Sequence, residues 1–477
     1  MALINIRHLR CNIFGRISAL YKKWFGDQPS TTTEAGLQLQ IISRDKHNIS
    51  RKQISPNAIK VLYRLHKAGY KSYLVGGGVR DILLGLDPKD FDVATDATPE
   101  QVKKLFRNSR LVGRRFRLAH ILFGREIIEV ATLRGHHVED NAKQSKTNTS
   151  GRLLRDNVYG SIDQDAERRD FSINAMYYDI SDFSIRAYGG ALQDLEAGRL
   201  KLLGDPETRY REDPVRMLRA VRFSTKLDLH IDESTKVPIN RLAPLLKDIP
   251  AARMYDEALK LFFNGKAVAN FDMMQQFDLF EPLFPTLGQA IADAPNGSAD
   301  RMAQLVMKAT DTRVMQDKPV TPSFFYAALL WYPLSERAHE IANEAGLNIY
   351  DAHFAAMGDI LEQQCQRISI PRRHSTPTKD IWQLQLRLER NQGGRALKLL
   401  EHPKFRAGYD LLLLRGEIEG GRVESLANWW TELVEADEGQ RRKLVRKQQP
   451  GRKPQNRRRR KPRSNDSKTK TESKARG

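Results

Sequence analysis

The pattern of apolar and polar positions changes character about halfway along the chain. Short apolar runs such as Tyr73-Leu74-Val75, and the segment 126–134 with its alternating apolar residues, predict strands. From about residue 240 to 436, apolar residues recur every three or four positions, which predicts helices. The expected helices cover residues 56–68, 242–246, 252–263, 271–283, 322–334, 351–365, 380–391 and 396–414. The sequence therefore predicts an α+β fold with a strand-containing N-terminal part and an all-α remainder.

Both ends of the chain have a different pattern from the middle. Residues 1–25 place Ile6, Leu9, Ile13 and other apolar residues at helical spacing among arginines and lysines, with no acid before Asp27. Three interpretations stay open: a packed or partner-binding helix, a helix lying on a membrane surface, or a targeting presequence. Residues 26–50 are polar and read as a linker, and residues 135–167 read as a mobile loop beside the active site.

Composition and charge narrow the class of protein. The 477 residues carry a net charge of +21, and residues 441–477 alone hold seventeen lysines and arginines against two acids. Such a basic block predicts a disordered tail that binds RNA backbone, with a solubilising or partner-docking tail as the alternative. No apolar run is long enough to span a membrane. The two cysteines, Cys11 and Cys365, argue against a disulfide framework or a zinc site and suit a reducing cytoplasm.

The stretch 73–93 carries the candidate chemistry. After the apolar run come Gly76, Gly77 and Gly78, then an apolar patch at residues 82–84 where a helix can start. Asp90 and Asp92 follow, and on a strand they would share one face, with Phe91 and Val93 buried behind them. Paired carboxylates suit a divalent cation shared with substrate phosphates, and glycine amides can approach a triphosphate closely. Either feature alone is more often a solvated acid pair or a simple turn; together they favour nucleotidyl transfer.

Three motifs carry a resemblance to a known family. VGGGVRDILLG followed by DFDVATDATPE resembles the head of the class II nucleotidyltransferases of the polymerase-β superfamily. RRDFSIN at residues 168–174 and EDPVR at residues 212–216 resemble two further motifs of that group. The group holds the bacterial poly(A) polymerases and the CCA-adding tRNA nucleotidyltransferases. The arginine-rich patch at residues 114–121 and the basic tail favour the poly(A) polymerases, which add AMP from ATP to RNA 3′ ends without a template.

The resemblance implies roles for single residues. Asp90 and Asp92 would hold Mg²⁺ (or Mn²⁺), and Asp170 would belong to the catalytic centre. Gly76, Gly77 and Arg80 would hold the triphosphate of ATP, and Arg169 would contact the nucleotide. A further three residues, Asp213, Arg216 and Arg219, would read the base. Asp213 before Pro214 is also a complete helix-start signal, with Asp at the N-cap and Pro at the first helical position.

Several alternatives stay open at this point. Glu129 points to the opposite face from Ile128 and Val130, so it is either a third carboxylate at the metals or a solvent-exposed residue. Arg114, Arg115 and Arg117 form either a solvated face or a contact with triphosphate or RNA. The alternative enzyme is a CCA-adding nucleotidyltransferase, and the alternative of another class is an RNA-binding scaffold that has lost catalysis. The resemblance to bacterial proteins argues against a targeting presequence.

The resemblance also implies a domain order and a set of partners. We expect an N-terminal extension and linker (1–45), a nucleotidyltransferase head with a mixed sheet (46–180), an all-α neck (181–245), a helical RNA-binding body (246–440) and a disordered tail (441–477). The expected substrates are RNA 3′ ends of mRNA, decay intermediates or tRNA. Other expected partners are RNA-degradation or RNA-chaperone proteins and, through residues 1–25, a membrane surface. We expect a cytoplasmic monomer, with membrane association left open.

Overall fold

A computed structural model describes residues 30–33, 36–113, 117–135, 145–147, 153–156, 158–390 and 394–447. Three of the sequence predictions concern residues outside this range: the amphipathic segment 1–25, the cluster Arg114-Arg115-Phe116, and the tail from residue 448 onward. The chain divides into two compact units, Met1–Lys379 and Asp380–Gly477. In the described part of the chain, no helix has the length and apolar character needed to cross a membrane.

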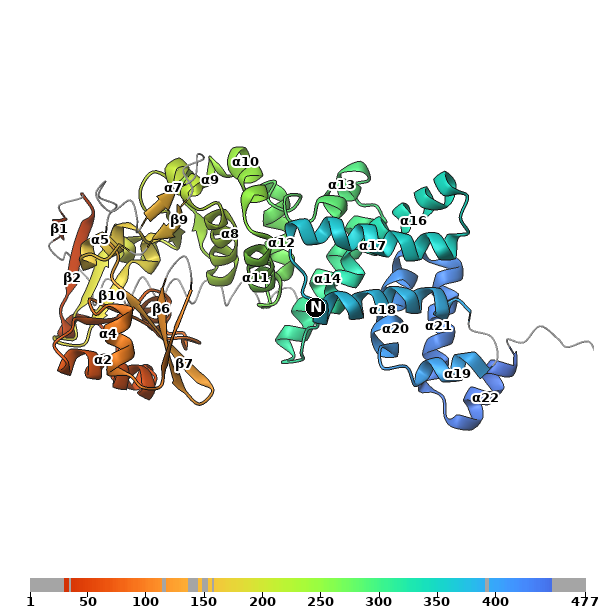
Figure 1. The fold of residues 1–477 in the computed structure, drawn as a ribbon, viewed down its shortest axis with the longest axis horizontal. Coiled ribbons are helices and arrows are strands. Elements are labelled where there is room, and N and C mark those ends of the chain that lie inside the picture. Colours follow the sequence, from red (N-terminus) through yellow and green to blue (C-terminus); the bar gives the residue numbers. More distant parts are fainter. Residues whose placement is uncertain are drawn as a thin grey trace, which may run out of the picture. The chain divides into compact units, whose positions relative to one another are not determined.

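The head is built on a mixed nine-stranded sheet, which confirms the predicted α+β class (Figure 1). Its strand order is β1-β2-β11-β10-β3-β4-β7-β6-β5, with β4 and β7 parallel and the other neighbours antiparallel. The strands are β1 (Ser30–Thr32), β2 (Gln38–Ile42), β3 (Ser72–Val75), β4 (Asp92–Thr95), β5 (Ser109–Val112), β6 (Leu118–Phe123), β7 (Glu126–Thr132), β10 (Met176–Asp179) and β11 (Ile185–Tyr188). The parallel pair β4·β7 matters most for the site, because it brings Asp92 and Glu129 side by side.

The head sheet extends beyond the predicted range 46–180 on both sides. β2 pairs with β11, so a segment read as a linker and a segment assigned to the neck both belong to the head sheet. In β2, Gln40 and Ile42 are buried while Ile41 is 48% exposed. This edge region therefore buries one face only, and its polar composition resembles that of a linker.

Two helices pack on the sheet: α2 precedes the glycine stretch in the sequence and α4 follows it. α2 (Pro56–Lys67) packs on β3, β4 and β7, and α4 (Pro99–Leu105) packs on β5, β6 and β7 (Figure 1). Ser55 caps α2 and Thr98 caps α4, in each case directly before a proline at the first helical position. A buried cluster that includes Tyr73 and Val75 of β3, Ala94 of β4 and Tyr177 of β10 forms a core of the head.

The predicted loop at residues 135–167 contains regular structure. β8 (Ser145–Thr147) and β9 (Leu153–Asp156) form an antiparallel hairpin, and α5 (Ile162–Glu167) follows. Ser161 and Gln164 form a capping box at the start of α5. This serine–glutamine spacing is a helix-start signal that the polar composition of the segment concealed.

The head continues into a helical region, as predicted. After the head come α6 (Ala191–Glu196), α7 (Pro206–Glu212), α8 (Val215–Leu227), α9 (Glu233–Lys236), α10 (Ile239–Leu242), α11 (Ala251–Phe262), α12 (Ala267–Gln276), α13 (Pro285–Asp293), α14 (Ser298–Met315) and α17 (Ile349–Arg367). Between α6 and α9, the short strands β12 (Arg199–Leu200) and β13 (His230–Ile231) pair in parallel. The helix predicted at residues 322–334 is two helices, α15 (Pro322–Leu329) and α16 (Trp331–Ala345).

The second unit is a separate helical bundle. α18 (Arg372–Leu388) leads into it, followed by α19 (Gly394–Leu400), α20 (Phe405–Glu419), α21 (Gly421–Glu435) and α22 (Glu438–Lys447). Trp430, Phe405, Tyr409 and Leu412 lie in its core. Residues 441–447, which the sequence analysis assigned to the tail, belong to α22, and Val445 is buried in this core.

Candidate active site

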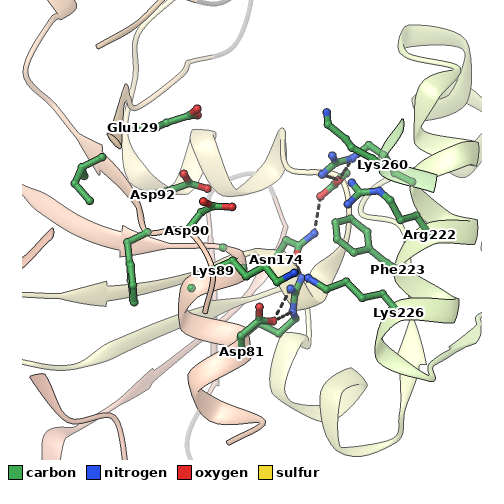
Figure 2. Close-up of a pocket in the computed structure, with 18 of the residues that line it drawn as sticks. Asp81, Lys89, Asp90, Asp92, Glu129, Asn174, Arg222, Phe223, Lys226 and Lys260 are labelled. Atoms are coloured by element: carbon green, nitrogen blue, oxygen red, sulfur yellow. Dashed lines mark hydrogen bonds and ion pairs between the residues drawn. The ribbon is translucent and has the colours of Figure 1, made fainter. Parts of the chain in front are cut away.

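A cavity of about 810 Å³ opens where the sheet meets α8 and α11. Its wall on the sheet side is acidic and its wall on the helix side is basic (Figure 2). The lining residues are Gly76, Gly77, Gly78, Arg80, Asp81, Lys89, Asp90, Phe91, Asp92, Arg125, Glu126, Ile127, Ile128, Glu129, Arg169, Asp170, Asn174, Arg219, Arg222, Phe223, Lys226 and Lys260. Eight of the ten residues predicted for the site are therefore found in one cavity.

Three carboxylates form the acidic wall. Asp92 is the first residue of β4, and it lies in register with Glu129 on the parallel strand β7. Asp90 stands two residues ahead, just before the strand rather than on it. The predicted proximity of the two aspartates is thus found, but Phe91 is only partly buried and lines the cavity itself.

The crowding of these carboxylates shows in the ionisation of Asp92. Burial raises the pKa of the Asp92 carboxyl to about 6, and the negative charges of Glu129 and Asp90 act in the same direction. Arg169 opposes them. Among the described residues, no three His, Cys, Asp or Glu side chains meet closely enough to cage an ion by themselves. The acidic wall is therefore an open cluster of oxygen donors, and the positive charge of Arg169 offsets only part of its negative charge.

The glycine stretch forms a tight turn beside this wall. Gly76 has a φ of +65°, and its amide donates to the carbonyl of Met176 at 3.0 Å. A Cβ at Gly76 would lie 3.1 Å from Nη1 of Arg169, and one at Gly78 would lie 3.7 Å from the carbonyl oxygen of Asp90. α3 spans Gly77–Leu83, so it begins at the glycines. The sequence analysis expected a helix to begin at the apolar patch of residues 82–84, where α3 in fact ends. Glycine thus lets the backbone pass closely between Arg169 and Asp90.

A chain of polar contacts joins this turn to the neck. Arg80, which is 2% exposed, donates to Asp81 at 2.6 Å and to the amide oxygen of Asn174 at 2.6 Å. The amide nitrogen of Asn174 donates to Asp170 at 3.1 Å, and Arg219 on α8 pairs with the other oxygen of Asp170 at 2.5 Å. Asn174 uses both ends of its amide, so it sets the positions of α3 and α8 relative to each other.

Both carboxylate oxygens of Asp170 accept hydrogen bonds within this series of polar contacts. Burial alone would raise its pKa, but Arg219 and hydrogen bonds from Asn174 and the amide of Phe171 hold the pKa well below the usual range. The structure places Glu129, and not Asp170, opposite Asp92 in the sheet register. Glu129 is therefore the carboxylate that neighbours Asp92 across the sheet, and a role for Glu129 or Asp170 at a metal stays a prediction.

Arg169 is anchored from behind. Its guanidinium donates to the hydroxyl of Tyr177 at 2.7 Å and to Asp165 at 3.2 Å, and Tyr177 in turn donates to Asp165 at 2.7 Å. The guanidinium carbon lies 4.8 Å from the centre of the Tyr177 ring. Arg169 therefore presents a fixed positive charge to the cavity next to Gly76.

The three predicted base-reading residues are not all in the cavity lining. Arg219 lines it, whereas Asp213 binds Arg253 through both carboxylate oxygens at 2.8 Å each. Arg216 donates to Glu212 at 2.9 Å and to the carbonyl of Arg209 at 2.6 Å. The expected helix cap is also wrong: Pro214 is the N-cap of α8, no side chain caps this end, and α8 starts at Val215. Sequence could not show these partners, because Arg253 lies 40 residues away on α11.

Other cavity residues were missed by sequence reasoning. Lys89, Arg222, Lys226 and Lys260 supply most of the additional positive charge, and Phe223 lies among them. One signal was available: Arg219, Arg222 and Lys226 follow one another at spacings of three and four, which places them on one helix face. Nothing local in the sequence marks Lys260, which comes from α11.

Three family models match the chain: the poly A polymerase head domain over residues 72–201, a probable RNA and SrmB-binding site of polymerase A over residues 228–291, and the polymerase A arginine-rich C-terminus over residues 345–465. Poly(A) polymerase I of Salmonella typhimurium is 53% identical over 426 residues, which cover 88% of this chain and 92% of that protein. A CCA-adding enzyme of Lactobacillus helveticus is 36% identical over 204 residues, which cover 43% of this chain and 49% of that protein.

Solved structures agree on the fold. A structure titled as a tRNA-processing enzyme (apo form I) matches with a TM-score of 0.55 at 21% identity, covering 84% of this chain and 98% of that chain. The sequence match to the CCA-adding enzyme stops at less than half of either protein, whereas the match to the poly(A) polymerase spans nearly all of both. The chain belongs to the family of bacterial poly(A) polymerase I.

Proposed function

We propose that the cavity transfers AMP from ATP to the 3′ end of an RNA, with release of pyrophosphate and without a template. The observation that carries this proposal is the acidic wall of Asp90, Asp92 and Glu129 beside the glycine turn, in a chain of this family. An attacking 3′-hydroxyl and a departing pyrophosphate must lie in line on opposite sides of the α-phosphorus. The cavity offers room for both between its two walls.

The acidic wall fits divalent cations. Carboxylate oxygens are the ligands that Mg²⁺ and Mn²⁺ prefer. Burial, together with the negative charges of Glu129 and Asp90, raises the pKa of Asp92, and a bound cation would offset both effects. We assign the cation ligands to Asp90 and Asp92, with Glu129 adjacent. When bound, such ions supply electrostatic stabilisation of the charge that develops on the reacting oxygens.

The residues around this wall position the nucleotide. The backbone of Gly76 and Gly77 lets the triphosphate approach, and Arg80 and Arg169 present positive charge that their own partners hold in place. Asp170 acts by fixing Arg219, through the ion pair between them. Catalysis then rests on positioning and on charge stabilisation, as in phosphoryl transfer generally.

The adenine edge is assigned to the start of α8. A carboxylate and a forked guanidinium can together read a donor and an acceptor of a base. Asp213 and Arg216 are the motif residues for this task, and Arg219, three residues after Arg216 on α8, lines the cavity. Reading the base requires that Asp213 shares its oxygens between Arg253 and the nucleotide.

RNA is assigned to the helices beyond the neck and to the basic tail. The match of residues 228–291 to a probable RNA and SrmB-binding site supports both an RNA contact and a protein partner of RNA metabolism there. The excess positive charge of residues 441–477 supports binding of RNA backbone.

Primer extension tests the proposed function. An unstructured RNA and a tRNA lacking its 3′ end are each supplied with Mg²⁺ and one nucleoside triphosphate at a time. We expect a long ladder on the unstructured RNA with ATP alone. Three defined additions on the tRNA that need CTP before ATP would show a CCA-adding enzyme instead.

Asp90→Asn tests the site. We expect turnover to fall by several orders of magnitude with the unfolding midpoint unchanged, since Asp90 is exposed in the cavity. Asp87→Asn, at an exposed position three residues upstream that does not line the cavity, is the matched control and should retain activity. Near-normal extension by Asp90→Asn would remove Asp90 from the catalytic centre.

A further inference from the structure

Apolar side chains gather on the surface at the corner between α16 and α17, which pack against each other as a helical hairpin (Figure 1). Leu347, Ile349 and Phe354 are 43%, 45% and 42% exposed. The ring of Tyr350 lies 5.2 Å from that of Phe354, measured between the ring centres. The other exposed large apolar residues of the described chain are scattered singly along the sequence, as is ordinary for a protein surface. These four residues, the corner patch, therefore indicate a binding surface.

The surface around the corner patch is acidic, although the chain as a whole carries a charge of +21. Residues 319–366 contain six aspartates and glutamates and a single lysine or arginine, Arg337. Arg337 is already paired with Glu340 at 2.9 Å and with Asp359 at 3.1 Å. The other four acids are exposed and form no ion pair within the described ranges: Glu336, Glu344, Asp351 and Glu362.

Acidic and apolar side chains share one face of α17. Asp351, Ala355 and Glu362 are separated by four and seven residues, which is helical spacing, and Phe354 stands next to Ala355. All four are exposed. Such a face repels the phosphates of RNA and suits a partner that offers apolar residues together with positive charge.

Residues 1–25 of this chain combine these two properties. Their apolar residues recur at helical spacing, and their five arginines and lysines with no acid give a charge of +5. The six acids and one arginine of residues 319–366 give −5. The other strongly basic part of the chain lacks the apolar residues, because residues 448–477 contain no Ile, Leu, Val, Met, Phe, Tyr or Trp.

We propose that residues 1–25 bind the corner patch. Their apolar residues cover Phe354 and its neighbours, and their arginines and lysines face the exposed acids of α16 and α17. An amphipathic segment that lays its apolar face on an exposed apolar surface is a common mode of recognition. This proposal selects one of the three interpretations of residues 1–25, a packed or partner-binding helix, and it does not depend on the proposed adenylyl transfer.

Cross-linking of the full chain tests this placement. Cys11 lies within the segment, and Cys365→Ser leaves it as the single natural thiol. Ala355→Cys then adds a thiol on the exposed face of α17, and Ala252→Cys on α11, which also replaces an exposed helical alanine, is the matched control. A short bis-maleimide should join Cys11 to position 355 and not to position 252. The size of the product on a denaturing gel shows whether the segment comes from the same chain or from a second copy, and either product supports the proposal.

A substitution within the corner patch should weaken the binding. We expect Phe354→Ser to slow the cross-linking of Cys11 to position 355 about tenfold, because burial of the aromatic ring no longer contributes. Val237→Ser removes a residue that is 68% exposed at the end of α9 and should leave the rate unchanged. Both residues are exposed, so the unfolding midpoints of the two variants should match that of the parent chain.

Three results would overturn the proposal. The first is cross-linking of Cys11 to positions 355 and 252 at the same rate, and the second is an equal rate in Phe354→Ser and Val237→Ser. The third is an absent cross-link to position 355 together with protection of Cys11 from alkylation when vesicles of anionic phospholipid are added, which would assign the segment to a membrane surface. None of these measurements requires incorporation of AMP, so failure of this inference and failure of the proposed function are distinguishable.

Discussion

At the scale of single residues, Asp170 shows how a motif residue can matter through its partner. Its carboxylate accepts from Arg219, Asn174 and a backbone amide, and its pKa is held well below the usual range. A carboxyl whose pKa is lower in the folded state than in the unfolded state stabilises the fold above the unfolded pKa, near 3.9. That stabilisation is lost as the pH falls below this value toward the folded pKa.

Asp170→Asn should therefore lower the free energy of unfolding at neutral pH by roughly 1.5–3 kcal/mol and flatten its decline in acid. Urea unfolding of the wild type and the variant between pH 7 and pH 3 measures both effects. Asp87→Asn, at an exposed position, should keep the pH dependence of the wild type. An identical pH dependence in Asp170→Asn and the wild type would show that this ion pair does not stabilise the fold.

The site residues that could be predicted from the sequence are those that belong to a short, recognisable motif. Asp90, Asp92, Arg80 and Asp170 stand in short motifs, and the structure brings all four to one cavity. What sequence could not predict is the choice of partner. Whether a cation is paired, as Arg219 is, or unpaired, as Arg222 is three residues later, depends on which carboxylate the fold brings within reach.

At the scale of elements, the junction of β3 and α3 is where backbone geometry and site coincide. Gly76 combines a positive φ with close contact to Arg169. Gly85, just past the end of α3, has a φ of +70°, and a Cβ added there would meet no atom within 4 Å. A side chain would strain the backbone at both positions, but only at Gly76 would it also contact a residue of the cavity. Substitutions at the two glycines therefore distinguish the two effects.

Gly76→Ala and Gly85→Ala should each lower the free energy of unfolding by about 1–3 kcal/mol, because an L side chain is strained at such φ values. Only Gly76→Ala should also raise the KM for ATP, since its methyl group displaces Arg169. Thermal unfolding and extension kinetics of both variants measure the two effects. Equal KM values in the two variants would mean that the turn is structural and does not approach the nucleotide.

Elements with strong periodicity were the ones that could be predicted. α2 and β3 lie where the apolar pattern placed them. The sequence analysis did not predict β2 and α22, and the reason is the same for both. Each buries only a narrow face, so its sequence is dominated by polar residues. Pairing with β11 and packing into the core of the second unit, respectively, supply the stabilisation that local pattern does not reveal.

At the scale of the whole molecule, the positive charge is distributed unevenly between the cavity and the C-terminal segment. The cavity balances its cations against an acidic wall, whereas most of the net charge of +21 lies in residues 441–477. Binding of RNA backbone by exposed cations weakens as salt rises, with a slope that reports the number of phosphates contacted. The cavity and the basic C-terminal segment should therefore respond differently to ionic strength.

Replacing Arg457, Arg458, Arg459 and Arg460 with glutamine should raise the KM for RNA, leave kcat at saturating RNA unchanged and leave the KM for ATP unchanged. For single-stranded RNA each lost phosphate contact reduces the slope of log affinity against log salt by about 0.7, so four lost contacts reduce it by about 3. Filter binding of an unstructured RNA at several salt concentrations measures this slope. Four glutamines at the exposed head residues Lys52, Lys60, Lys67 and Lys103 remove the same charge elsewhere and should leave the slope near that of the wild type. If both variants changed the slope equally, RNA would be responding to net charge alone, and the C-terminal segment would have no particular place in binding.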